Sequence, residues 1–549
     1  MSEYKQNKNN KLYIYLPFIL SLAVILGIYI GGILKQNNNS KFLFNKNISA
    51  QNKLDQVIEI IEEMYVDSVN EKELEEEAIT SLLENLDPHS YYISAKEFAE
   101  MNEPLEGNFD GIGVEFRIVK DTVVVIQPIA GGPSEKVGIM PGDRIVQVDT
   151  INIAGVGITN KKVMKLLKGP RGSKVKVGVK RKGIDKILYF TIIRDRIPIN
   201  SVMSAYFIRP EVAYIKIARF AKPTYQEFIE KCEDFLNKGA KKIIVDLRGN
   251  GGGLLDAAIK ISDEFLPKGD LIVYTEGRAR PRKDYKASAY GILENAQVNI
   301  LIDENSASAS EIVAGAIQDN DRGLIIGRRS FGKGLVQEQL SWPDGSALRL
   351  TVARYYTPSG RCIQKPYDKG LEQYRKEAYE RYFNGELLSK DSIHFNDSLK
   401  YFTKHGRVVY GGGGIMPDIF IPLDTSYRSD FLNELAFSGI FLQFTFDYAD
   451  NNRDKLHQLY PTTERFLERF EVNAQIMDEF INFAKEKGLQ IPPLYQYKNS
   501  LDFMKLRLKA GIARNLYNDD IYYRILNEED PAIQKALETD ISAVLENGI

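Results

Sequence analysis

Residues 305–337 read NSASASEIVAGAIQDNDRGLIIGRRSFGKGLVQ, and two short pieces of this stretch suggest chemistry. The first, Ser-Ala-Ser-Ala-Ser from Ser306 to Ser310, opens a run of apolar residues with the period of a helix. The second, Phe-Gly-Lys-Gly at 331–334, follows a strand-like segment and sets one lysine between two glycines. We interpret Ser308 as a nucleophile and Lys333 as the general base that takes its proton.

A serine hydroxyl becomes a good nucleophile only when a neighbouring base accepts its proton. A neutral lysine can be that base, because burial lowers its ordinary pKa of about 10.4 by as much as roughly 3–5 units. Gln337 lies four residues beyond Lys333, on the same face of a strand or a helix, and is predicted to orient the lysine. The four histidines have no sequence setting typical of a catalytic base: His89, His394, His405 and His457.

Simpler interpretations exist for both motifs. Ser308-x-x-Glu311 ahead of an apolar run is the pattern of a helix capping box. Lys333, taken alone, reads as a surface lysine in a turn. A cap and a nucleophile are compatible, because the free N–H groups of a helix N-terminus stabilise negative charge.

A third motif favours the catalytic interpretation. The buried-type strand at 243–245 runs into Asp-Leu-Arg-Gly-Asn-Gly-Gly-Gly at 246–253. Such glycines let backbone N–H groups converge on one point, and in acyl transfer that point is the oxyanion hole. A phosphate-binding loop is excluded, because its pattern ends in Gly-Lys-Ser/Thr and this turn ends in Gly-Leu-Leu.

DLRGNGGG, SASASEI and FGKGLVQ, in this order, resemble the C-terminal processing (tail-specific) serine peptidases over roughly residues 57–422. The resemblance implies that Ser308 is the nucleophile, Lys333 the base and Gln337 the orienting residue, with no metal or cofactor. It also implies an oxyanion hole built from the N–H of Ala309 and that of Gly251 or Gly252.

Residues 107–197 resemble a PDZ domain, which captures the free carboxyl end of a protein by strand addition. Gly111, Ile112, Gly113 and Val114 match its carboxylate-binding loop, and the alternative is that they form only a tight turn. Arg144 either senses a bound tail or forms a structural ion pair.

An uncharged segment at 12–34 is long enough as a helix to cross a bilayer, about 34 Å at roughly 1.5 Å per residue. We therefore expect a retained single-pass anchor in the cytoplasmic (inner) membrane, followed by a linker at 35–52 and helices at 53–106. The short N-terminal tail and the family resemblance imply that the bulk of the chain faces the periplasm.

The remaining sequence predicts a multidomain α/β protein. Alternating strand and helix patterns place the peptidase core at 198–424, with a charged insertion at 368–404. Residues 425–549 read as helices with a packing or oligomerisation role. The net charge of −2 gives no case for nucleic acid binding. Two cysteines, Cys232 and Cys362, exclude a disulfide framework, and whether they pair is not set by the sequence.

Two functions follow. The first is a membrane-anchored serine endopeptidase that recognises protein C-termini through its PDZ domain and cleaves through an acyl-enzyme. The alternative is a catalytically silent PDZ adaptor that only binds protein tails; the presence of Ser308, Lys333 and Gln337 together argues against it.

Overall fold

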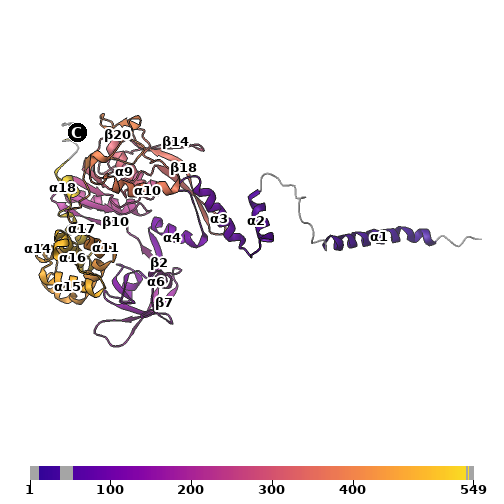
Figure 1. Cartoon of the computed structure of the whole chain (residues 1–549), viewed down its shortest axis with the longest axis horizontal. Coiled ribbons are helices and arrows are strands. Elements are labelled where there is room, and N and C mark those ends of the chain that lie inside the picture. The colour runs from indigo at the N-terminus through magenta and orange to yellow at the C-terminus, as the bar shows by residue number, and fades with distance from the viewer. Residues whose placement is uncertain (1–10, 37–52, 540–541, 543–549) are drawn as a thin grey trace, which may run out of the picture. The chain divides into compact units, whose positions relative to one another are not determined.

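The computed structural model describes residues 11–36, 53–539 and 542, and it divides into two compact units at residue 78. Helices α1 (Lys11–Gln36) and α2 (Lys53–Met64) belong to the first unit, and α3 (Glu71–Glu84) runs across the division. Figure 1 shows these elements and those of the second unit.

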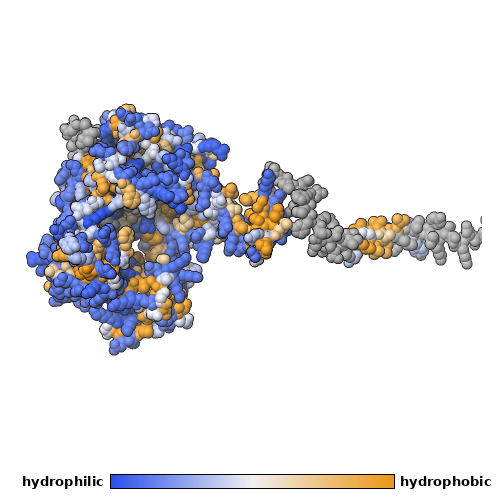
Figure 2. Space-filling model, viewed as in Figure 1, coloured by the Kyte–Doolittle hydropathy of each residue, from blue (hydrophilic) through white to orange (hydrophobic). Residues whose placement is uncertain are grey.

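Helix α1 covers the segment predicted to be a membrane anchor at 12–34. Its described residues are largely hydrophobic (Figure 2), and its exposed apolar side chains are Leu20, Leu22, Val24, Ile25, Leu26, Ile28 and Ile30. Within the described ranges, no helix is both long enough and apolar enough to span a membrane.

A six-stranded sheet forms the centre of the second unit. Its order is β10 (Val202–Arg209), β11 (Val212–Ile217), β12 (Lys242–Asp246), β15 (Gln297–Ile302), β16 (Leu324–Gly327) and β21 (Ile419–Phe420). All neighbouring pairs are parallel except β10 with β11. Parallel strands are covered on both faces, which explains their continuous apolar runs.

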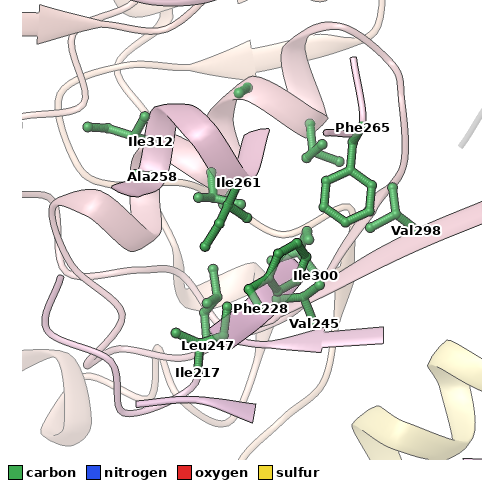
Figure 3. Close-up of a cluster of buried hydrophobic side chains, with 14 of the residues drawn as sticks. Ile217, Phe228, Val245, Leu247, Ala258, Ile261, Phe265, Val298, Ile300 and Ile312 are labelled. Carbon is green, nitrogen blue, oxygen red and sulfur yellow. The ribbon is translucent and has the colours of Figure 1, made fainter. Parts of the chain in front are cut away.

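Helices cover both faces of this sheet. Helices α7 (Thr224–Asn237), α8 (Leu255–Asp263) and α9 (Ala309–Asp319) share one apolar core with the strands. In Figure 3, Val245 and Ile300 from the sheet lie beside Phe228 from α7. On the other face, Ile533 of α18 (Pro531–Glu538) packs with Ile244 and Leu301. Helix α18 thus completes the cover of the central sheet.

A second sheet is antiparallel and lies beside the site described below. It contains β1 (Tyr91–Ile93), β18 (Ala347–Tyr356), β13 (Leu271–Gly277) and β14 (Arg280–Lys286), and β17 (Leu335–Ser341) also pairs with β18. Between β1 and the first PDZ-region strand lies α4 (Ala95–Glu106). The pairing of β1 with β18 brings the turn at residues 87–90 against this sheet.

The PDZ-like region has a sheet of its own. The strand order is β3 (Val114–Val119), β4 (Thr122–Pro128), β5 (Arg144–Val148), β7 (Lys174–Lys180) and β8 (Leu188–Ile193), with β6 (Ile151–Asn152) paired to β5. Two helices accompany it, α5 (Pro133–Lys136) and α6 (Asn160–Leu167). Strands β2 (Asn108–Gly111) and β9 (Asp195–Pro198) pair where the chain enters and leaves.

Helices between residues 430 and 527 form a bundle with a separate apolar core. They are α11 (Asp430–Phe437), α12 (Ile440–Asn451), α13 (Arg453–Leu459), α14 (Thr463–Arg469), α15 (Ala474–Glu486), α16 (Leu501–Leu516) and α17 (Asp519–Asn527).

The insertion at 368–404 contains α10 (Gly370–Phe383) and the strand β19 (Lys400–Phe402), which pairs with β20 (Val408–Tyr410) just beyond it. Cys232 and Cys362 are both free thiols.

Candidate active site

The three motifs meet because each follows the carboxyl end of a strand in the parallel part of the central sheet. The glycine-rich turn follows β12, Ser308 follows β15, and the loop with Lys333 follows β16. These three strands are neighbours in the order β12-β15-β16, so their carboxyl ends share one edge. Ligands and catalytic groups of open α/β sheets gather at that edge.

Ser308 occupies the N-cap of α9 in a conformation that is rare for a residue with a side chain. Its φ is 56° and its ψ is −113°. Gly252, with a φ of 98°, packs directly against it: a Cβ there would lie 2.7 Å from Ser308 Cβ and 2.6 Å from the Ala307 carbonyl oxygen. Only glycine permits this approach and this φ. The strained turn holds the Ser308 hydroxyl at the start of the helix.

Glu311 joins the nucleophile turn to the lysine loop. Its Oε2 accepts the N–H groups of Ser308 at 2.8 Å and Lys333 at 2.9 Å. Its Oε1 accepts the Gly332 N–H at 2.7 Å and the Ser330 hydroxyl at 2.5 Å. The side chain is fully buried, and this burial raises the pKa of Glu311 to about 7, against the lowering effect of its four donors. The predicted capping glutamate is therefore also the bridge between two motifs.

Tyr355 makes a second bridge. Its hydroxyl lies 2.7 Å from the carbonyl oxygen of Lys333 and 3.2 Å from that of Ser308. Burial raises the pKa of Tyr355 well above its ordinary value, so the hydroxyl keeps its proton and remains a donor. Tyr355 belongs to strand β18, so the antiparallel sheet holds the turn of Ser308 and the loop of Lys333 through one hydroxyl.

One cavity of about 610 Å³ is lined by residues from all three motifs. The side chains of Ser308 and Lys333 both line it, but no hydrogen bond joins Ser308 Oγ to Lys333 Nζ among the residues that the structure describes. The predicted site residues on its wall are Ser308, Ala309, Lys333, Gln337, Gly251 and Gly252.

The charge state of Lys333 is set by its surroundings. Burial lowers the pKa of the amine, and the positive charge of Arg349 lowers it further, while Glu311 and Asp87 act in the opposite direction. Flanking glycines allow the tight packing, because a Cβ on Gly334 would lie 2.9 Å from the Gln364 backbone nitrogen. A buried amine with a lowered pKa is suited to accept a proton.

The candidate oxyanion donors differ in availability. The Gly252 N–H already donates to Asn250 Oδ1 at 2.9 Å. In the described part of the chain, the backbone N–H groups of Ala309 and Gly251 donate no hydrogen bond. Ala309 and Gly251 are therefore the two predicted donors that can receive a developing negative charge without losing a hydrogen bond.

Gln337 lines the same cavity, and among the described residues no hydrogen bond joins it to Lys333. Its Nε2 donates to Thr351 Oγ1 on the neighbouring strand at 3.2 Å. The pairing of the two strands shifts by a bulge between Val336 and Gln337. A bulge re-aims a side chain, here the amide on the cavity wall.

The predicted tail-binding residues lie together at the start of β3. Gly113 has a φ of 72°, and the Ile112 carbonyl oxygen is held by the Ser134 N–H at 3.0 Å and the Ser134 hydroxyl at 2.6 Å. Arg144 lies elsewhere: it pairs with Asp450 of α12 at 3.6 Å, which matches the structural ion pair weighed above.

Several site groups escaped the sequence analysis because they come from distant segments. His89 lines the cavity, and burial, with the charge of Lys333 next, lowers its pKa to about 4. Its Nε2 lies 2.9 Å from the Tyr374 hydroxyl on α10. From the same helix, Arg381 donates to the carbonyl oxygens of Arg329 at 2.7 Å and Ser330 at 3.0 Å. The insertion thus supports the lysine loop, although it carries no chemical motif.

Four family models match the chain. Residues 211–372 match peptidase family S41, and residues 111–191 match the PDZ domain. Residues 32–97 match the N-terminal domain of the activating protease CtpB, and residues 431–518 match a family of unknown function.

Curated relatives span most of the chain. A carboxy-terminal-processing protease of Bartonella bacilliformis is 36% identical over 336 residues, which are 59% of this chain and 76% of that protein. The carboxy-terminal processing protease CtpA of Bacillus subtilis is 31% identical over 389 residues, 70% of this chain and 80% of its own length.

Among solved structures, the photosystem II D1 C-terminal processing protease is 25% identical, with a TM-score of 0.35, and the match covers 67% of this chain and 87% of that one. The family models and the curated relatives agree with one another. This chain belongs to the carboxy-terminal processing proteases, serine peptidases of family S41 that here carry a PDZ domain.

Proposed function

We propose that the protein is an endopeptidase that works with a Ser308–Lys333 dyad. Ser308 Oγ attacks the scissile carbonyl carbon while Lys333 Nζ takes the hydroxyl proton. Lys333 then gives this proton to the leaving amine, which leaves an acyl-enzyme on Ser308. A water molecule repeats the sequence and releases the acid. The observation that supports this most directly is that Ser308, Lys333 and the free N–H of Ala309 line one cavity.

The dyad needs one change from the geometry described above, because Ser308 Oγ and Lys333 Nζ are not hydrogen-bonded to each other. Catalytic hydrogen bonds commonly tighten only when substrate is bound. Glu311 and Tyr355 fix the backbones on both sides, so the remaining adjustment belongs to the lysine side chain and Ser308 χ1.

The PDZ domain supplies tail recognition in this proposal. Strand β3 lies at an edge of its sheet and follows the loop of residues 111–113 directly, so it can pair with an extended peptide whose carboxylate meets the loop N–H groups. Substrate proteins are therefore recognised by a free C-terminus. An adaptor function without cleavage remains the alternative.

One assay separates the two functions. The full chain is incubated with an unfolded protein that ends in a free carboxylate, and with the same protein ending in an amide. We expect cleavage of both, with the amidated form slower by about tenfold or more, since charge-assisted hydrogen bonds to the carboxylate are lost. Equal rates would argue against tail recognition. Binding of the free tail without any cleavage would favour the adaptor.

The pH profile tests the base. Only neutral Lys333 accepts a proton, so kcat/KM should rise with pH through the pKa of Lys333. Arg349 lowers that pKa and is held by Gln339 Oε1 at 2.8 Å. The variant Arg349→Gln should raise the pKa and move the acid limb to higher pH. Arg354→Met, which changes an exposed arginine of the same strand, should leave the limb in place. A limb that moves to lower pH in Arg349→Gln would contradict the assignment.

Membrane attachment through residues 12–34, with the bulk in the periplasm, is a separate part of the proposal. It is supported by the uncharged sequence of this segment, although no described helix meets the requirements for a membrane span. The expected result is that the full chain stays with membranes after alkaline carbonate extraction and that a variant lacking 12–34 is released. Release of both would remove the anchor from the proposal.

A further inference from the structure

The turn formed by Asp87, Pro88, His89 and Ser90 leads into β1 and holds one threonine of the adjacent strand. Asp87 Oδ1 accepts the backbone N–H of His89 at 2.8 Å and of Ser90 at 3.0 Å. The Thr351 hydroxyl lies 3.0 Å from the same oxygen. The Ser90 hydroxyl donates to Asp87 Oδ2 and accepts the Thr351 backbone N–H at 3.0 Å. Thr351 is thus fixed through both its backbone and its side chain.

Thr351 in turn contacts the residue predicted to orient the lysine. Thr351 on β18 and Gln337 on β17 are directly paired across the two strands, next to the bulge at Val336. Gln337 Nε2 donates to Thr351 Oγ1 at 3.2 Å. A chain of hydrogen bonds therefore runs from Asp87 through Thr351 to the wall of the catalytic cavity.

This chain has a fixed direction, because each group has a limited set of hydrogens. A carboxylate only accepts, and a threonine hydroxyl has one hydrogen to give. Since that hydrogen points to Asp87, Thr351 Oγ1 offers only lone pairs to Gln337. The Gln337 amide must then turn its nitrogen, Nε2, toward Thr351. Its oxygen, Oε1, therefore points away from Thr351.

The amide atom left without a hydrogen bond, Oε1, is an acceptor, and an acceptor is what can orient the Lys333 amine. Among the residues described, Gln337 Oε1 receives no hydrogen bond, and Gln337 and Lys333 line the same cavity. An amide oxygen accepts an N–H of Lys333 and so leaves the lone pair of a neutral amine to point elsewhere. A flipped amide would instead offer two hydrogens to an amine that must keep its lone pair for Ser308.

We propose that Thr351, with its hydroxyl directed by Asp87, is a positioning residue of the peptidase: it selects the amide orientation of Gln337 that presents Oε1 to Lys333. The inference rests on the proposed dyad. It assigns a catalytic purpose to the Asp-Pro-His-Ser turn, which lies outside the three motifs of the core.

The test is a set of full-length variants assayed on an unfolded protein substrate. Thr351→Val keeps the shape of the side chain and removes the hydroxyl, so kcat should fall about tenfold, the effect of one hydrogen bond, with KM unchanged. Thr351→Ser should restore most of the loss. Thr191→Val, at an exposed threonine of β8, is the matched control for the substitution itself.

A double-mutant cycle separates positioning from general structural damage. If Thr351 acts through Gln337, Thr351→Val should cost nothing further in a Gln337→Ala background. Independent, multiplicative losses would overturn the inference, as would full activity of Thr351→Val. A second variant, Gln337→Glu, puts an oxygen against Thr351 Oγ1 and should lose activity as Gln337→Ala does; wild-type activity there would also overturn it.

Ser308→Ala, run in parallel, keeps this inference distinct from the dyad. An active Ser308→Ala would overturn the dyad and this inference with it. An inactive Ser308→Ala beside a fully active Thr351→Val would overturn only the positioning role.

Discussion

Replacing Lys333 by Met should lower kcat for peptide cleavage by about 10³-fold or more, because Ser308 then has no base to take its proton. Lys333→Arg should be equally inactive: arginine keeps the positive charge and much of the length, but it does not deprotonate in proteins. Both variants should fold, since the contacts that hold the loop use the Lys333 backbone, through Glu311 and Tyr355.

A double variant of Ser308 and Lys333 tests whether the two residues act as one unit. Ser308→Ala should cost about as much as Lys333→Met, and the double variant should cost little more than either, because residues that act as one unit fail together. Lys260→Met, at an exposed lysine of α8, controls for loss of a lysine. Residual activity in Lys333→Arg near the wild-type level, or losses that multiply in the double variant, would remove Lys333 from the role of base.

Replacing Glu311 by Gln should produce the second large effect, on both stability and activity. Each carboxylate oxygen accepts at least one backbone N–H, from Ser308 and Lys333 on one side and from Gly332 on the other. A glutamine at this position has two amide orientations, and in each of them its NH₂ group faces at least one of these backbone N–H donors. A buried N–H then faces another donor, at a cost of about 1–3 kcal/mol for each donor left unsatisfied.

We therefore expect Glu311→Gln to lower the free energy of unfolding by about 3 kcal/mol and kcat by about 100-fold, since the loop that carries Lys333 loses its tie to the nucleophile turn. The midpoint of urea unfolding and steady-state cleavage rates measure the two effects. Glu434→Gln, at an exposed glutamate of α11, is the matched control. A Glu311→Gln protein as stable as wild type would show that this bridge does not hold the two motifs together.

The chemical class of this protein can be predicted from its motifs and their order in the chain. The peptidase family and the serine peptidase class follow from three motifs, and the comparisons confirm both. The strand and helix patterns predict a multidomain α/β fold, which the structure confirms. The glycine-containing motifs of residues 107–197 predict a PDZ domain, which a family model confirms. The dyad of Ser308 and Lys333 stays a prediction.

Other parts of the site depend on contacts that no local pattern encodes. His89 has no sequence setting typical of a catalytic base, yet strand β1 carries its turn to the cavity wall. Arg144 was weighed as a tail sensor, and it pairs with Asp450 from the bundle. Residues 425–549 are predicted to have a packing or oligomerisation role, and only the structure shows that α18 packs on one face of the central sheet.

The sequence by itself determined which groups can react. Residue types decide which protons or hydrogen bonds a segment can donate or accept, and the spacing of glycines decides where the backbone can turn tightly. Only the tertiary structure decided which of these groups meet. Glu311 bridges two motifs, Ala309 and Gly251 keep free N–H groups, and Asp87 reaches Gln337 through Thr351. The physical reason is that such contacts are set by strand order and register between segments distant in the chain, whereas sequence periodicity reports only the face that each segment buries.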